Sequence, residues 1–115
     1  MRRPELFLKD MSDASANILA YTKDFTIQQF KKDQKTIDAV IRNIEIIGEA
    51  ANKVPEELKT KYSHIEWRES TAMRNIVMHE YFGVDLDIIW ETVLKDISKI
   101  KQDVDLILSE LASDN

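Results

Sequence analysis

The stretch LDIIWETVLKDISKIKQDVDLILSEL, residues 86–111, decides the fold class of this 115-residue chain. Its apolar residues alternate spacings of four and three from end to end: Leu86, Trp90, Val93, Ile97, Ile100, Val104, Ile107 and Leu111. Such a heptad seam is typical of a long helix that packs nearly antiparallel in a bundle or against a partner. An intramolecular bundle is favoured over a free coiled coil, because the other helical segments also need a surface to pack on.

Helical periodicity runs through the upstream sequence as well. The segment TIDAVIRNIEIIGEAANKVP, residues 36–55, carries one apolar stripe that ends at Pro55. Further helices are expected over about 4–24, over 55–62 and from around Trp67 towards Gly83. Thr26 reads as the start of a short helix with a capping box, and Asp85 as the cap of the last helix. We therefore predict a single all-α domain over residues 1–115, an up-and-down bundle of four to five helices.

Composition narrows the class of protein. The chain has no cysteine, which excludes disulfides and thiolate metal sites. The first residues contain no apolar run of the length that a signal peptide or a membrane span needs, so a cytoplasmic location and no membrane contact are expected. The formal net charge is −5, whereas nonspecific nucleic-acid binders are usually basic. Any RNA binding must therefore depend on a local positive site.

The motif RNIVMHEY, residues 74–81, gathers the residues best suited to chemistry. On a regular helix Asn75 and His79 lie about 40° apart, but Arg74 and His79 lie about 140° apart. They can act together if the helix loosens before Gly83, or if a two-fold dimer brings Arg74 and His79 of both chains into one cleft. No metal site is expected, since paired histidines and clustered carboxylates at ligand spacing are absent from the sequence.

Two interpretations of this motif remain open on chemistry alone. A histidine moves protons near neutral pH and an arginine binds a phosphate through its planar fork. Together they suffice for RNA cleavage by the 2′-hydroxyl, without a metal or other cofactor. Equally, a histidine in the last turn of a helix can bind unpaired carbonyls, and a tyrosine there can bury its ring.

The motif and its surroundings resemble a known family. RNIVMHEY has the R-x-x-x-x-H-x-Y signature of HepT-like HEPN-domain proteins, the ribonuclease toxins of HepT/MntA-type toxin–antitoxin modules. The segments DAVIRNIEIIGEAAN (38–52) and IEWRESTAMRNIVMHEYFGVDLDIIW (65–90) match the family in order and spacing, so the resemblance covers nearly the whole chain.

The resemblance implies a HEPN-like bundle that forms a homodimer with the two motifs in a common cleft. Arg74 and His79 would be the catalytic pair of a metal-independent endoribonuclease, and Asn75 would be a polar substrate contact beside them. Tyr81 matches the tyrosine to which a cognate MntA-like nucleotidyltransferase antitoxin transfers AMP. These properties describe a type VII-like toxin–antitoxin module.

Other residues carry weaker signals. Arg42 and Asn43, in the middle of an expected helix, either line the same cleft and contact phosphate or the partner chain, or form a solvated polar face. Arg68 extends the positive surface or pairs with a nearby glutamate. Trp67 and Trp90 are expected in the core or in an interface, and the further histidine, His64, is expected in an exposed loop.

Two other classes of function stay open. The chain is alternatively a catalytically silent nucleotide-binding or adaptor bundle that docks a nucleotidyltransferase, and the negative net charge modestly favours this reading. A purely structural helical dimer would explain the heptad seam but would leave the motif without a role.

Overall fold

The computed structural model describes residues 2–80 and 85–113, with the side chains of 76–80 excluded. Within this part of the chain there are seven α-helices and no strand, which confirms the all-α prediction. The helices are α1 (Pro4–Thr22), α2 (Ile27–Lys31), α3 (Gln34–Lys53), α4 (Glu56–Lys61), α5 (Trp67–Glu80), α6 (Leu86–Lys95) and α7 (Ile97–Ser113). No helix in the described residues is long and apolar enough to cross a membrane.

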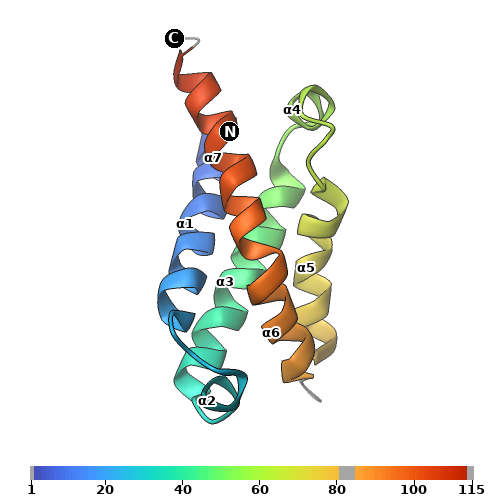
Figure 1. The fold of residues 1–115 in the computed structure, drawn as a ribbon. Coiled ribbons are helices and arrows are strands. Elements are labelled where there is room, and N and C mark those ends of the chain that lie inside the picture. The colour runs from blue at the N-terminus through green and yellow to red at the C-terminus, as the bar shows by residue number, and fades with distance from the viewer. Residues whose placement is uncertain (1, 81–84, 114–115) are drawn as a thin grey trace.

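The long helices form the expected up-and-down bundle. Figure 1 shows α1 and α5 running one way and α3 and the α6–α7 pair running the other, with α2 and α4 at opposite ends. Helix α3 packs on both α1 and α5, and α7 packs on α1. The seven described helices outnumber the predicted four to five of the bundle, because they include the two expected short helices, α2 and α4, and because the last long helix is divided.

The division of the last helix falls at Asp96, inside the heptad seam. The N–H of Asp96 still donates to the Thr92 carbonyl at 2.9 Å, and its own carbonyl accepts from the N–H of Ile100 at 3.0 Å. The side chains of Trp90, Val93, Ile97, Ile100, Val104 and Ile107 are all buried. The prediction of one continuous helix was therefore wrong at a single residue. The predicted buried seam is confirmed for its six central residues, while Leu86 and Leu111 at its ends are half-buried.

Both predicted helix caps are present. The Thr26 hydroxyl accepts from the N–H of Gln29 at 3.1 Å, and the N–H of Thr26 donates to the Gln29 side chain at 2.8 Å. This reciprocal pair satisfies donors that a helix N-terminus otherwise leaves unbonded. The Asp85 side chain accepts from the N–H groups of Asp87 and Ile88 and so caps α6.

Helices α3 and α5 approach each other closely at Gly48. A Cβ atom on Gly48 would lie 2.8 Å from the backbone nitrogen of Arg74 and 2.9 Å from its Cβ. Contacts this short cannot be relieved by a side-chain rotation alone, because one of the opposing atoms belongs to the α5 backbone. Glycine is therefore the residue that lets α5 rest on α3 at the first position of the RNIVMHEY motif.

Candidate functional site

Arg74 lies where α5 packs on α3, and its side chain is 35% exposed. One guanidinium nitrogen, Nη1, lies 3.8 Å from the Glu49 Oε1 atom on α3. The Glu49 side chain is more open to solvent, with 58% of it exposed. The helix contact thus holds the base of Arg74 while its charged end stays near solvent, where an incoming phosphate could reach it.

The backbone of α5 remains helical through Glu80, so Arg74 and His79 both belong to one helix. Their backbone positions are then about 140° apart around the helix axis. The helix does not end before His79, so regular helical geometry keeps the two positions on different faces of α5. The side chain of His79 and the whole of Tyr81 lie outside the described residues.

Asn75 is exposed and lines an open hollow of about 500 Å³ where α4 meets the first turns of α5. Lys59, Arg68 and Glu56 line the same hollow, and Lys59 Nζ lies 4.0 Å from Glu56 Oε1, so two cations and one carboxylate surround the amide. Arg68, Ala72, Asn75 and His79 are spaced by four, three and four residues, which places them on one stripe of α5. Sequence reasoning missed Lys59, because nothing in the spacing indicates that α4 folds back beside this stripe.

Arg42 is exposed and opens on a different hollow, of about 340 Å³, between α1 and α3. Its Nη1 atom lies 3.5 Å from a Glu45 carboxylate oxygen. Glu49 also lines this hollow, and its carboxylate lies 3.8 Å from Arg74. The structure therefore places Arg42 on the Arg74 side of the bundle, whereas Asn75 belongs to the hollow with Lys59 and Arg68.

Asn43, next to Arg42 in sequence, is buried, with 7% of the residue exposed. Its Oδ1 atom accepts from Asn17 Nδ2 on α1 at 3.2 Å, and its Nδ2 atom donates to the Ala39 carbonyl at 2.8 Å. Both ends of the amide are thus bonded within the protein. Arg42 and Asn43 do not share a surface, because neighbouring residues on a helix point about 100° apart.

A third hollow, of about 270 Å³, lies between α5 and α7. Its lining includes the apolar side chains of Ile65, Met73 and Ile100, together with one lysine and four carboxylates: Lys99, Glu66, Glu69, Asp96 and Asp103. Desolvation and the Glu66 carboxylate raise the pKa of Asp96. Four carboxylates against one lysine give this hollow a negative net charge, which disfavours RNA there.

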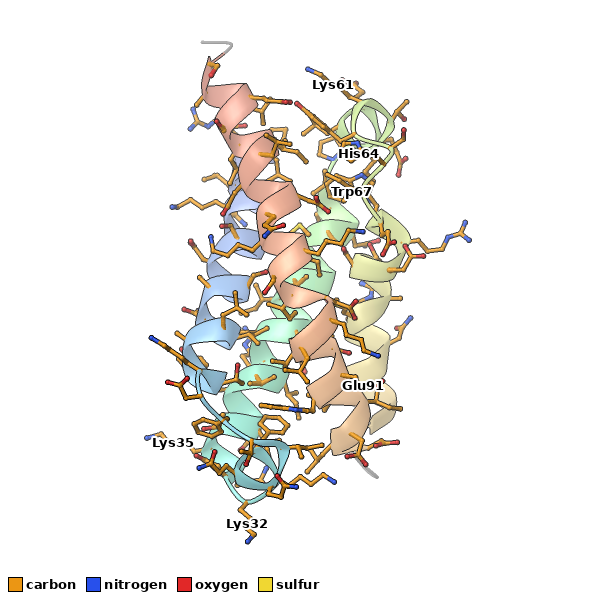
Figure 2. All side chains as sticks on the ribbon, in the orientation of Figure 1. Lys32, Lys35, Lys61, His64, Trp67 and Glu91 are labelled. Atoms are coloured by element: carbon orange, nitrogen blue, oxygen red, sulfur yellow. The ribbon has the colours of Figure 1, made fainter. Side chains whose placement is uncertain are left out.

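The structure also shows where the two tryptophans and His64 lie. Trp67 and Trp90 are buried, as expected of core residues, and Trp67 Nε1 donates to the Tyr62 carbonyl at 3.0 Å. His64 is exposed in the connection between α4 and α5, close to Trp67 at the start of α5 (Figure 2). Among the described residues, no three histidine, cysteine, aspartate or glutamate side chains gather in a way that could hold a metal ion.

Comparison with known proteins adds the family context. The family described as "Ribonuclease HepT-like" matches residues 11–107. A Thermococcus cleftensis protein named "Probable ribonuclease HepT" is 41% identical over 95 residues, which cover 83% of this chain and 86% of that protein. No solved structure matches the chain at a significant level.

Two relatives from Methanocaldococcus jannaschii show how far the similarity extends. One, named a gamma-glutamylcyclotransferase and "putative RNase", is 45% identical over 107 residues, or 93% of this chain. The alignment covers only 48% of that longer protein. The other, named a "putative RNase", is 34% identical over 106 residues, covering 92% of this chain and 97% of the relative.

Proposed function

The chain belongs to the HepT-like ribonuclease family, and from this membership we propose that it is a metal-independent endoribonuclease toxin whose catalytic pair is Arg74 and His79. The observation that carries the proposal is the position of Arg74. Its helix backbone rests against Gly48, and its half-buried side chain presents a charge at the surface. An arginine held this way suits the binding of a phosphate that becomes more negative during reaction.

The proposed reaction needs only the RNA and these side chains. The 2′-oxygen of a ribose bonds to the adjacent phosphorus after His79 accepts its proton, and the bond from phosphorus to the 5′-oxygen breaks. The departing 5′-oxygen takes up a proton from water and protonated His79 returns its proton to water, so the products are a 2′,3′-cyclic phosphate and a 5′-hydroxyl. Arg74 stabilises the negative charge that develops on the phosphate oxygens.

The helical geometry favours a site that is shared by two chains. Because Arg74 and His79 stand about 140° apart on one helix, we propose that Arg74 of one chain acts with His79 of its partner across a two-fold axis. The RNA would extend from this cleft over Arg42 on one side and over Asn75, with Lys59 and Arg68, on the other. Asn43 takes a packing role in this proposal.

Control of the activity is proposed to act through Tyr81. A MntA-like nucleotidyltransferase antitoxin would transfer AMP to the tyrosine hydroxyl and release pyrophosphate from ATP. The modification adds bulk and a negative phosphate to the motif, which would oppose RNA by occupancy and by charge.

A second candidate function is a catalytically silent adaptor or nucleotide-binding bundle that docks the transferase. The net charge of −5 and the carboxylates around the α5–α7 hollow favour it, because both weaken the capture of RNA. An adaptor, however, has no evident need for Arg74, His79 and Tyr81 together.

The test of the first function is RNA cleavage by the purified full chain in the presence of a chelator. Intact mass is measured first, so that only protein without AMP is assayed. We expect products that end in a 2′,3′-cyclic phosphate and no cleavage of DNA of the same sequence, because DNA lacks the attacking hydroxyl. If unmodified, folded protein cuts none of several RNAs, the adaptor becomes the better account.

The Tyr81 proposal has its own test in co-expression with the candidate transferase. The parent chain should gain the mass of one or more AMP groups, and Tyr81→Phe should gain none, since it keeps the ring but loses the acceptor hydroxyl. Tyr21→Phe, at an exposed tyrosine on α1, is the matched control and should still be modified. An undiminished mass gain in Tyr81→Phe would show that AMP is attached elsewhere.

A further inference from the structure

Two neighbouring residues of α3 act on Arg74 in different ways. Gly48 touches the backbone and Cβ of Arg74, so it determines where the residue sits. Glu49 reaches only the charged end, at 3.8 Å. The position of Arg74 is therefore set by the packing of two helix backbones and does not depend on the carboxylate.

The contact between Glu49 and Arg74 is loose. Strong bonds between a guanidinium and a carboxylate are about 2.7–2.9 Å long, well below the 3.8 Å found here. With 58% of the Glu49 side chain exposed, water screens the pair and competes for both partners. Such a pair partly neutralises the charge of Arg74 in the free protein. It only weakly opposes the transfer of the guanidinium to another ligand.

We propose that Glu49 is a displaceable counter-ion for Arg74, which an RNA phosphate replaces when it binds. The proposal rests on the proposed function, since RNA is taken as the ligand. A phosphate diester that enters beside Arg74 offers closer, two-pronged contacts to the guanidinium than Glu49 makes. The carboxylate then turns into solvent, or towards the hollow that it shares with Arg42.

One consequence is that Glu49 weakens RNA binding without contributing to the chemical step. Its charge lies beside the phosphate site and must be moved before the complex forms. Removing that charge should strengthen binding by no more than an exposed ion pair is worth, which corresponds to about a two- to fivefold change. The effect should also require Arg74, because the carboxylate acts through that residue.

The test is a double-mutant cycle for RNA binding in a chain that cannot cut. In a His79→Ala background, the dissociation constant of a 2′-O-methyl RNA is measured by fluorescence anisotropy with and without Glu49→Gln. We expect Glu49→Gln to bind about two to five times more tightly, and Glu49→Ala to match it if charge is the cause. With Arg74→Ala also present, neither change should alter affinity.

A matched control separates this effect from the overall change in net charge. Asp38→Asn also removes one negative charge from α3, on nearly the same face but about 16 Å away along the helix. It should change affinity much less than Glu49→Gln. In the cleavage assay, Glu49→Gln should lower KM by a factor similar to its gain in binding and leave kcat unchanged.

Each other outcome has a defined meaning. The proposal would be overturned if Glu49→Gln strengthened RNA binding equally with and without Arg74, or if Asp38→Asn strengthened it as much. It would also be overturned if Glu49→Gln weakened RNA binding, or if no form of the chain bound RNA. If the parent chain cuts no RNA but the gain still depends on Arg74, the proposed function fails and the counter-ion role stands. If the parent cuts RNA and the gain is absent, the reverse holds.

Discussion

Arg74→Ala should lower the rate of RNA cleavage by about 10²–10³-fold, the usual effect of removing a group that stabilises charge in the transition state. The loss should appear mainly in kcat, because the guanidinium is proposed to bind most strongly when the phosphate is most negative. The measurement is single-turnover cleavage of an end-labelled RNA by mass-checked parent and variant.

Stability should change little in the same variant. The charged end of Arg74 makes one loose ion pair near the surface, and such pairs contribute about 0–1 kcal/mol. Arg74→Lys is the control, since it keeps the charge but loses the planar fork, and it should retain only part of the activity. Full activity in a folded Arg74→Ala protein would remove Arg74 from the catalytic pair.

Gly48→Ala should destabilise the fold by about 1–3 kcal/mol, the usual cost of forcing an extra methyl group into a packed interface. The sign of the change in the free energy of unfolding is informative, because replacing glycine by alanine inside a helix ordinarily stabilises the helix by roughly 0.5–1 kcal/mol. Here the new Cβ would meet the Arg74 backbone at 2.8 Å, and α5 would have to move away from α3. The free energy of unfolding, from denaturant titration followed by circular dichroism, tests this directly.

The same displacement should reduce RNA cleavage, since a shift of about 1 Å in a catalytic group can cost about 10²-fold. Asn52→Ala, at an exposed position of the same helix, is the matched control. It should gain a few tenths of a kcal/mol from helix propensity and leave cleavage unchanged. A stabilised and fully active Gly48→Ala protein would mean that the close approach of α3 and α5 is not needed.

Much of the fold could be predicted because periodicity reports which residues are buried. The alternation of four and three over residues 86–111 identified the buried seam, and the caps at Thr26 and Asp85 marked two helix starts. The break at Asp96 could not be predicted, because the apolar spacing continues unchanged across it. Apolar spacing records the face that is buried and is insensitive to a local change in the helix axis.

Only part of the candidate site could be predicted from the sequence. Residues on one helix, such as Asn75 and His79, can be compared by counting turns, and the motif was found in that way. The contacts of Arg74 with Gly48 and Glu49 join residues about 25 positions apart in sequence, and they depend on how α3 packs on α5. Counting turns would have separated Arg42 from Asn43, since adjacent helical residues lie on different faces.

The most direct test of the account is RNA cleavage in chelator by the parent, by Arg74→Ala, by His79→Ala and by the two variants unfolded and refolded together. If Arg74 of one chain acts with His79 of its partner, each variant alone should cut RNA at least about 10²-fold more slowly than the parent. The mixture should then recover up to about a quarter of the parent rate, since about half of its dimers are mixed and each holds one intact pair. An inactive mixture beside an active parent would contradict the shared site, and an inactive parent would contradict the ribonuclease itself.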